Sequence, residues 1–263
     1  MPLPADAHIG TVSLTVSDLD RSLPFYRDIL GFQEISRAGR TSSLSAGGGR
    51  PLIELHERRD AVPRPRRSTG LFHFAILVPS RAALGRSLRR LADRQWPLSG
   101  AADHLVSEAL YLDDPDGLGI EIYRDRPRET WRRANGELAM ATDPLDVQGV
   151  ASEAGADEPW QGLDADTVIG HMHLHVSRLD EGEAFYCGEI GFAPMVRSYP
   201  GALFVSAGGY HHHLGMNTWA GVGAPAPPEN AVGLRSFSIE GNGLDRRDVE
   251  DAAARVVVTL VGG

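Results

Sequence analysis

Two short motifs recur along the chain at almost the same spacing. Phe25-Tyr26 with Gly31-Phe32 reappears 160 positions later as Phe185-Tyr186 with Gly191-Phe192. Ser45-Ala46-Gly47-Gly48 reappears 161 positions later as Ser206-Ala207-Gly208-Gly209. Two matches at nearly one offset indicate that half of the chain is duplicated. The fold must therefore be built from copies of one unit that bury their apolar faces together.

The first unit has the pattern of a strand, a helix and three further strands. Residues 9–17 alternate in the manner of a half-buried strand and end at Asp18, a residue typical of a helix cap. Apolar side chains at helical spacing follow as far as Leu30, and Gly31 is typical of a helix end. Short strands are predicted near 32–37, 41–46 and 51–56. The unit is thus βαβββ.

Each half also contains a weaker second copy. In the first half the pattern predicts a strand over 71–78, a helix over 81–93, and strands over 109–112 and 119–123. In the second half a strand over 234–239 is followed by a predicted helix at about 244–254 and one strand over 256–260. The fourth unit therefore appears in the sequence as a shortened copy that lacks about two strands.

The expected fold class is α+β, with four βαβββ modules of which the fourth is shortened. We expect units one and two over 1–125, a linker rich in proline, glycine and charge over 126–167, and units three and four over 168–263.

Composition excludes several classes of function. Lysine and arginine total 26 against 35 acidic residues, a net charge of −9, so nucleic acid is not an expected partner. Cys187 is the single cysteine, which rules out an internal disulfide and favours a reducing compartment. Neither a signal-peptide pattern nor an apolar run long enough to span a membrane occurs, so we expect a soluble, cytoplasmic protein.

These motifs resemble those of the vicinal oxygen chelate superfamily, which includes glyoxalase I, extradiol catechol dioxygenases, and fosfomycin and bleomycin resistance proteins. The likeness covers nearly the whole chain apart from the linker and the shortened end. Within the superfamily, 113–128 and 206–215 look most like bacterial two-domain proteins similar to catechol 2,3-dioxygenase. The residues that carry the resemblance are Val16-Ser17-Asp18-Leu19, Phe25-Tyr26, Leu30-Gly31-Phe32, Asp114-Pro115-Asp116-Gly117, Ile120-Glu121-Ile122-Tyr123, Phe185-Tyr186 and Gly191-Phe192.

The resemblance implies that each pair of units forms a glyoxalase-like, barrel-type sheet around a metal. It also implies that the ligands lie on the first and last strands of each unit. The equivalent first-strand positions here are Thr11, His73, His171 and Ser236. The last-strand positions are Glu54, Glu121 and Gly215, and the fourth would lie near position 280, beyond the end of the chain.

Two pairings of the units are open. If units one and two pair, their pocket offers Glu54, His73 and Glu121, and the other pocket offers His171 alone. If unit two pairs with unit three, and one with four, the middle pocket collects His73, Glu121 and His171. The second arrangement is favoured because it completes one ligand set and keeps the shortened unit away from the chemistry.

Two imidazoles and one carboxylate suit Fe(II) best, with Mn(II) or another divalent metal as an alternative, and leave open coordination positions. A catechol-like aromatic diol and O2 could fill them, so the resemblance implies an extradiol ring-cleaving dioxygenase. The resemblance also implies a difference from glyoxalase I, a member of the superfamily that uses four protein ligands. The fourth ligand position in this chain is Gly215, which has no side chain that can coordinate a metal.

Other residues are candidates for proton handling around the metal. Residues 211–213 are predicted to lie on the last strand of unit three, so strand alternation puts His213 and His211 on the face of Gly215, towards the pocket, and His212 on the other face. His213 is the first choice and His211 the second, because imidazole exchanges protons near neutral pH. Tyr123 shares the face of Glu121 and could donate a hydrogen bond to a substrate oxygen.

Two other functions stay open at this point. One is a glyoxalase-type lyase, isomerase or thiol transferase that uses the metal as a Lewis acid. The other is a protein without catalysis that binds a small molecule or sequesters an antibiotic. A homo-oligomer is also an expected assembly, because a second copy could cover strand edges that an incomplete fourth unit leaves exposed.

Overall fold

The structure is a computed structural model, and it describes residues 1–47, 49–155 and 159–262. Gly48, which belongs to the second repeated motif, lies outside the described residues. Among the described residues, no helix has the length and apolarity needed to cross a membrane.

Units one to three each begin with a strand and a helix and continue with three more strands. The strands of units one and two are β1 (His8–Val16), β2 (Gln33–Ala38), β3 (Thr41–Ser45), β4 (Ile53–Glu57), β5 (Gly70–Leu77), β6 (Gly100–Asp103), β7 (Ser107–Asp113) and β8 (Gly119–Asp125). The linker carries β9 (Arg133–Ala134), β10 (Glu137–Leu138) and β11 (Asp143–Pro144). The later strands are β12 (Val168–His175), β13 (Ala193–Val196), β14 (Ala202–Ser206), β15 (Leu214–Asn217), β16 (Gly233–Gly241), β17 (Arg247–Asp251) and β18 (Val256–Gly262). The helices are α1 (Leu19–Pro24), α2 (Arg81–Asp93), α3 (Val147–Ser152) and α4 (Leu179–Glu183), and π-helical turns over Phe25–Ile29 and Ala184–Ile190 extend α1 and α4.

Two large sheets divide the units between them. The nine-stranded sheet has the order β11-β6-β7-β8-β5-β12-β15-β14-β13, so it joins unit two to unit three. The seven-stranded sheet has the order β17-β18-β16-β1-β4-β3-β2, so it joins unit one to unit four. The α+β class and the favoured pairing of the units are therefore confirmed.

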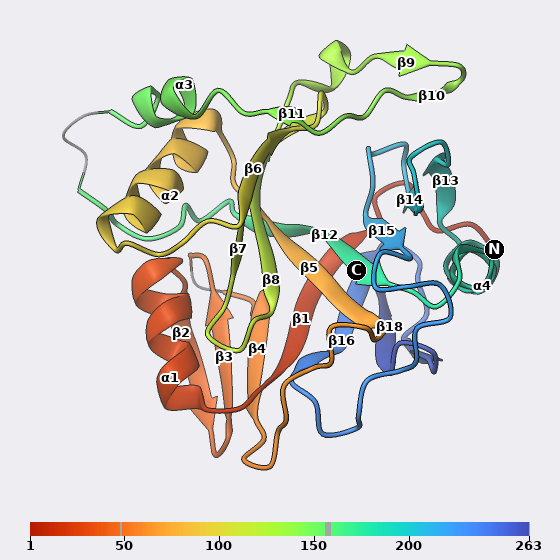
Figure 1. The fold of residues 1–263 in the computed structure, drawn as a ribbon, viewed down its shortest axis with the longest axis horizontal. Coiled ribbons are helices and arrows are strands. Elements are labelled where there is room, and N and C mark those ends of the chain that lie inside the picture. The colour runs from red at the N-terminus through yellow and green to blue at the C-terminus, as the bar shows by residue number, and fades with distance from the viewer. Residues whose placement is uncertain (48, 156–158, 263) are drawn as a thin grey trace.

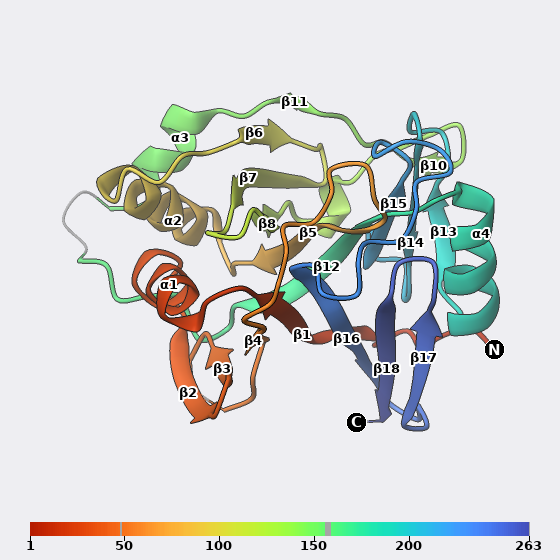
Figure 2. The ribbon, with the colours of Figure 1, turned by 60° about the horizontal axis from the view of Figure 1, so that its bottom comes forward.

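Both sheets are assembled by the same rule. In every unit the first strand is parallel to the last strand, and the first strands of paired units are antiparallel to each other. Both views place α1 and α2 next to each other at one end of the molecule and α4 at the other end (Figures 1 and 2). Buried apolar residues from both sheets form one continuous core, which fixes the sheets against each other.

Two buried tyrosine–aspartate hydrogen bonds link units that belong to different sheets. The Tyr26 hydroxyl, just after α1, donates to Asp114 Oδ2 in the turn before β8 at 3.0 Å. The Tyr186 hydroxyl, just after α4, donates to Asp251 Oδ2 at the end of β17, also at 3.0 Å. The tyrosines of the repeated Phe-Tyr motif thus join unit one to unit two and unit three to unit four.

The fourth unit differs from the prediction in two ways. The prediction of a helix at about 244–254 is wrong, because Arg247–Asp251 forms β17 and pairs antiparallel with β18. The alanines and charged residues of this segment favour a helix by local propensity. In the folded chain, pairing with β18 satisfies its backbone hydrogen-bonding groups instead. Within residues 233–262, which the structure describes, the unit therefore has three strands and lacks the helix and one strand of the other units, rather than two strands.

The fourth last-strand position also exists within the chain, contrary to expectation. The strand β18 runs parallel to β16 with Thr259 opposite Ser238, as Glu121 lies opposite Ala75 in unit two. The position expected near 280 is therefore occupied by Thr259, since the unit reaches its last strand sooner than the others.

Removal of the Tyr186 hydroxyl should destabilise the protein. In a Tyr186→Phe variant the buried Asp251 carboxylate loses one hydrogen-bond donor, so we expect the free energy of unfolding to fall by about 1–2 kcal/mol. Urea unfolding at pH 8 measures this change. Tyr199→Phe is the matched control, because its hydroxyl bonds to Thr142 in an exposed setting and should contribute less than about 0.5 kcal/mol. Equal losses in the two variants would contradict the role given to the Tyr186–Asp251 bond.

Candidate metal centre

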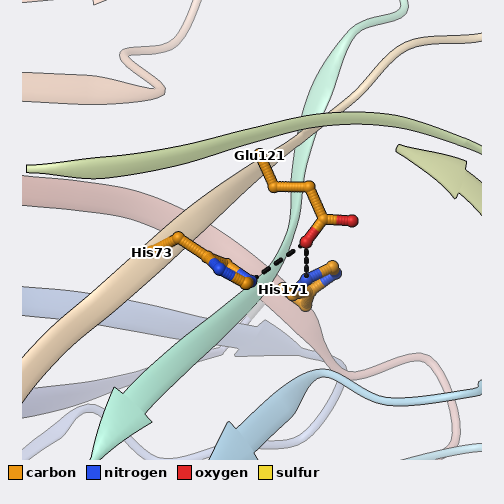
Figure 3. Close-up of side chains that lie close together, drawn as sticks. All are labelled: His73, Glu121 and His171. Atoms are coloured by element: carbon orange, nitrogen blue, oxygen red, sulfur yellow. Dashed lines mark hydrogen bonds and ion pairs between the residues drawn. The ribbon is translucent and has the colours of Figure 1, made fainter. Parts of the chain in front are cut away.

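Three buried side chains from the nine-stranded sheet converge on one point (Figure 3). His73 comes from β5, Glu121 from β8 and His171 from β12, and β5 lies between the other two strands. Glu121 Oε2 lies 3.0 Å from His73 Nε2 and 3.1 Å from His171 Nε2. One donor atom from each residue lies within 4.8 Å of the others, and the two imidazole rings are 5.5 Å apart. This is a spacing at which the three side chains could hold one metal ion.

The strand register explains why these residues meet. In the β5–β8 pair Glu121 lies opposite Ala75, which shares a face with His73 two positions away. In the β5–β12 pair Ala75 lies opposite His171. The carboxylate and both imidazoles are therefore on the same face of three adjacent strands. A register slip of one residue would turn a whole strand's side chains to the other face.

Units one and four, which form the outer, seven-stranded sheet, have the same strand register as units two and three but different residues at the ligand positions. Their equivalent positions are Thr11, Glu54, Ser236 and Thr259. Glu54 Oε2 accepts a hydrogen bond from Ser13 Oγ at 2.8 Å, and none of the other three has an imidazole or carboxylate. The outer sheet thus keeps the geometry of the centre without its ligand set.

Glu121 and His171 have the protonation states that metal binding requires. Burial raises the pKa of the Glu121 carboxyl, but the two neighbouring histidines, His171 above all, outweigh burial and hold the pKa well below its usual value. Burial lowers the pKa of His171 to about 4 against the opposing effect of Glu121. At neutral pH the centre therefore combines a carboxylate with a neutral His171 imidazole.

Unsatisfied nitrogens support the same fit. His73 Nε2 and His171 Nδ1 are buried without a hydrogen-bond partner among the described atoms. His73 Nε2 lies close to Glu121 Oε2 but without the alignment of a hydrogen bond. Buried polar atoms normally have partners, so the unsatisfied His73 Nε2, which lies beside the carboxylate oxygen that His171 Nε2 also contacts, is typical of a metal ligand.

Gly215 provides space at the fourth ligand position. It lies opposite His173 in the β12–β15 pair, and a Cβ atom at Gly215 would come within 3.0 Å of the His173 ring. The His173 imidazole packs 5.0 Å from that of His73, and its Nε2 accepts a hydrogen bond from Asn217 Nδ2 at 3.0 Å. The glycine therefore makes room for an imidazole that supports the centre from the side.

The three adjacent histidines do not alternate as a strand would. The strand β15 begins at Leu214, so residues 211–213 precede it in a bend. Of the three, His212 lines the cavity at the centre, with its ring 4.2 Å from that of His171. His213 Nδ1 instead accepts a hydrogen bond from the Ala207 backbone at 3.2 Å. His211 and His213 are not among the residues that line the cavity, because the three histidines lie in a bend and do not alternate along a strand.

A chain of hydrogen bonds runs behind His212. His211 Nε2 lies 2.8 Å from Asp125 Oδ1, and His211 Nδ1 lies 2.7 Å from His212 Nδ1. The Tyr210 hydroxyl donates to Asp125 and also contacts the Tyr123 hydroxyl at 2.8 Å. Tyr123 is therefore buried in this network, with its ring 4.8 Å from that of His171, and it is not among the residues that line the cavity.

Tyr111 and His104 are cavity residues that the sequence reasoning missed. Tyr111 lies directly opposite Glu121 in the β7–β8 hairpin, and its hydroxyl is 2.5 Å from His104 Nε2. His104 Nδ1 lies 2.6 Å from the Ala141 carbonyl oxygen and donates to it. The cross-strand partner of Glu121 could have been identified from the tight turn at Asp113–Gly117, which fixes the hairpin register.

The cavity beside the centre has a volume of about 570 Å³. Its walls come from unit two, unit three and the linker, which contributes Met140 and Thr142. The centre therefore lies where a small organic molecule can reach it.

The metal-free protein should lose stability in acid through its buried histidines. Burial lowers the pKa of His213 to about 3, whereas an unfolded chain has a histidine pKa of about 6.5. The unfolded state therefore binds this proton first, and stability falls as the pH drops from about 6.5 towards about 3. His213→Asn retains an acceptor for the Ala207 amide. It should reduce the slope of the free energy of unfolding against pH by up to about 1.4 kcal/mol per pH unit. Urea unfolding between pH 4 and 7 measures it, with the exposed His8→Asn as control; parallel curves for wild type and His213→Asn would contradict the prediction.

Comparisons with known proteins place this chain in a family. Residues 8–122 match the model of the Glyoxalase/Bleomycin resistance protein/Dioxygenase superfamily. The chain is 52% identical over 238 residues to a catechol-2,3-dioxygenase of Bacillus subtilis (strain 168), which covers 89% of this chain and 82% of that protein. A putative dioxygenase structure from Bacillus subtilis subsp. subtilis str. 168 shares the fold, with a TM-score of 0.62, 15% identity, and coverage of 96% of this chain and 84% of that one. A V278E mutant of glyoxalase I from Zea mays has a TM-score of 0.56 and 14% identity, with coverage of 98% and 92%. The chain therefore belongs to the glyoxalase/bleomycin resistance protein/dioxygenase superfamily.

Proposed function

We propose that this protein is a metal-dependent extradiol dioxygenase that cleaves the ring of a catechol-like aromatic diol with O2. The observation that carries the proposal is the buried set of His73, His171 and Glu121 beside a cavity of about 570 Å³. The 52% identity to a catechol-2,3-dioxygenase over most of the chain supports the same reaction.

His73, His171 and Glu121 would hold the metal, which is Fe(II) or, as the alternative, Mn(II). Two imidazoles and one carboxylate on one face are typical of iron centres that keep open positions. Such a cation would act as a Lewis acid and would bring the diol oxygens and O2 to one centre. The three strands fix the ligands before the substrate arrives, because each side chain is buried on a paired strand.

His212 would take a proton from the substrate. Asp125 accepts from His211 Nε2, so His211 Nδ1 is an acceptor and His212 Nδ1 carries the hydrogen between the two rings. The remaining nitrogen of His212, Nε2, is then unprotonated and available to a diol hydroxyl in the cavity. Burial holds the pKa of His212 well below its usual value, so the imidazole is neutral at pH 7.

His211 and Tyr123 would act behind His212 rather than on the substrate. His211 fixes the tautomer of His212, and Tyr123 is connected through Tyr210 to Asp125, the acceptor that orients His211. The direct proton-handling role first predicted for His213 stays a prediction, and a variant described below tests it.

Tyr111 would orient the substrate from the opposite wall. His104 donates from Nδ1 to Ala141, so its neutral form accepts at Nε2 from the Tyr111 hydroxyl. This leaves the Tyr111 oxygen as an acceptor beside the centre, and burial together with the charge of Glu121 raises the tyrosine pKa well above its usual value. Tyr111 thus stays a neutral phenol throughout the working pH range.

Substitution of Glu121 should remove the metal and the activity together. Glu121→Gln keeps the size of the side chain but not its charge, so we expect loss of bound Fe(II) or Mn(II) and a fall in ring cleavage of at least about 100-fold. Metal analysis after anaerobic reconstitution and the absorbance of the ring-cleaved product measure the two effects.

The matched control is Glu54→Gln, which changes the equivalent position of the outer sheet. It should keep wild-type metal content and activity. Tight Zn(II) or Ni(II) with no cleavage of any diol would contradict the dioxygenase proposal, and so would full activity in Glu121→Gln.

Substitution of His212 should impair proton transfer with little effect on metal binding. We expect His212→Gln to lower kcat by about 100-fold to 1,000-fold and to change the pH profile of kcat, with nearly normal metal content. His213→Asn is the comparison, because His213 bonds to Ala207 and does not line the cavity. A larger loss in His213→Asn than in His212→Gln would restore the role that the sequence predicted for His213.

A further inference from the structure

The cavity has two chemically different ends. The His73–Glu121–His171 centre and His212 form a polar end, and an aromatic wall formed by Phe72, Tyr199, Phe204 and Trp219 continues from it. The Phe72 ring lies 5.1 Å from that of His73, and the Phe204 ring lies 4.9 Å from that of His212. The aromatic wall therefore starts directly beside the centre on both sides.

The four rings of the aromatic wall are in contact with each other as far as the mouth of the cavity. Trp219 lies 5.4 Å from Phe72 and 6.4 Å from Tyr199, and Tyr199 lies 5.7 Å from Phe204. Trp219 is 48% exposed, which places it at the edge of the cavity. A substrate bound at the centre would thus extend along ring surfaces towards solvent.

The polar atoms of the aromatic wall are already engaged by the protein. Trp219 Nε1 donates to the Pro200 carbonyl at 3.2 Å, and the Tyr199 hydroxyl bonds to Thr142 Oγ1 at 2.7 Å. The wall therefore presents aromatic carbon atoms to the cavity, since its Trp219 and Tyr199 polar atoms have partners in the protein. Aromatic carbon atoms favour apolar groups, whose burial is stabilising in proportion to their area.

The charge of the lining argues against an acidic substituent. Among the described residues that line the cavity, none is a lysine or an arginine, and Asp113 and Glu121 are acidic. A carboxylate on the substrate would lose its hydration without gaining a cationic partner, which is costly.

The volume of the cavity exceeds the need of a single unsubstituted ring. At about 570 Å³ it falls within the range of roughly 300–1,000 Å³ that sites for drug-sized ligands occupy. An unsubstituted diol would fill the polar end and leave the aromatic wall uncovered. We infer that the preferred substrate, given the proposed dioxygenase function, is a catechol with an uncharged alkyl or aryl substituent that packs on Phe204, Tyr199 and Trp219.

A substituent series tests this inference on the Fe(II)-loaded protein. The substrates are catechol and its 4-methyl, 4-ethyl, 4-propyl and 4-butyl derivatives, with 3-(3,4-dihydroxyphenyl)propanoate as the carboxylated match. We expect kcat/KM to rise about fourfold per added carbon, mainly through KM, because the contact is the same in the ground and transition states. The kcat/KM of the carboxylated compound should be at least tenfold below that of 4-propylcatechol, whose side chain has the same number of carbons. A flat or falling series, or a preference for the carboxylate, would overturn the inference.

Binding to the metal-free protein separates this inference from the proposed function. Calorimetric titration with the same series should give dissociation constants that fall with alkyl length, whether or not any ring is cleaved. If no member is cleaved by the Fe(II)-loaded protein, the dioxygenase proposal fails, and the titration still decides the specificity. Dissociation constants independent of alkyl length would overturn it.

Two variants locate the effect on the aromatic wall. Trp219→Ala should lower the ratio of kcat/KM for 4-butylcatechol over catechol by about tenfold, whereas Trp160→Ala, which removes a tryptophan that does not line the cavity, should leave this ratio unchanged. Met140→Arg adds a cation to the lining and should raise kcat/KM for the carboxylated compound at least tenfold. An unchanged ratio in Trp219→Ala would assign the preference elsewhere and refute the role of the wall.

Discussion

The antiparallel pairing of β5 with β12 is the contact on which the candidate metal centre depends. It joins unit two to unit three across the linker and places Ala75 opposite His171, so that His73 and His171 share one face. Neither unit has the complete ligand set, since unit two supplies a histidine and a glutamate and unit three supplies one histidine. The centre therefore exists only where the two units form one sheet, and its geometry is as rigid as the backbone hydrogen bonds between these strands.

Because the outer sheet is assembled by the same strand pairing, its ligand positions can carry other residues without loss of the fold. Units one and four repeat the register of the inner sheet, but Thr11, Ser236 and Thr259 replace the ligands. The fourth unit can lack a helix and a strand because no residue of the centre comes from it, while β17 still supplies Asp251 for the Tyr186 hydroxyl. The shortened unit thus retains its contribution to packing, and none of the three candidate ligands comes from it.

Much of the fold and the centre could be predicted because they depend on periodicity and on repetition. The helix over 81–93 was predicted with the bounds that the structure has, since its apolar spacing and Ser80 cap are local signals. Convergence of His73, Glu121 and His171 was predicted from the ligand positions that the superfamily resemblance implies, located in this chain by comparison of equivalent positions in the units. The prediction failed where tertiary contacts override local preference: β17 forms from a helix-favouring segment, and the bend at His211–His213 depends on contacts with Asp125 and Ala207. Tyr111 was not predicted as a cavity residue because alternation along one strand does not show which residue of the neighbouring strand lies opposite Glu121.

The number of ligands at the centre depends on the space beside one glycine. A side chain at position 215 able to coordinate would need the volume that the His173 ring now occupies, since even a Cβ atom would come within 3.0 Å of it. Asn217 holds that ring by donating to Nε2 and holds His175 through its Oδ1, so the imidazole cannot turn aside without the loss of buried hydrogen bonds. A fourth protein ligand at position 215 would therefore push the His173 ring from its present place beside the centre. Because the chain has the His173 ring there, a bound metal would keep the open positions that a diol and O2 require, whereas a four-ligand centre of the glyoxalase type would have fewer to offer.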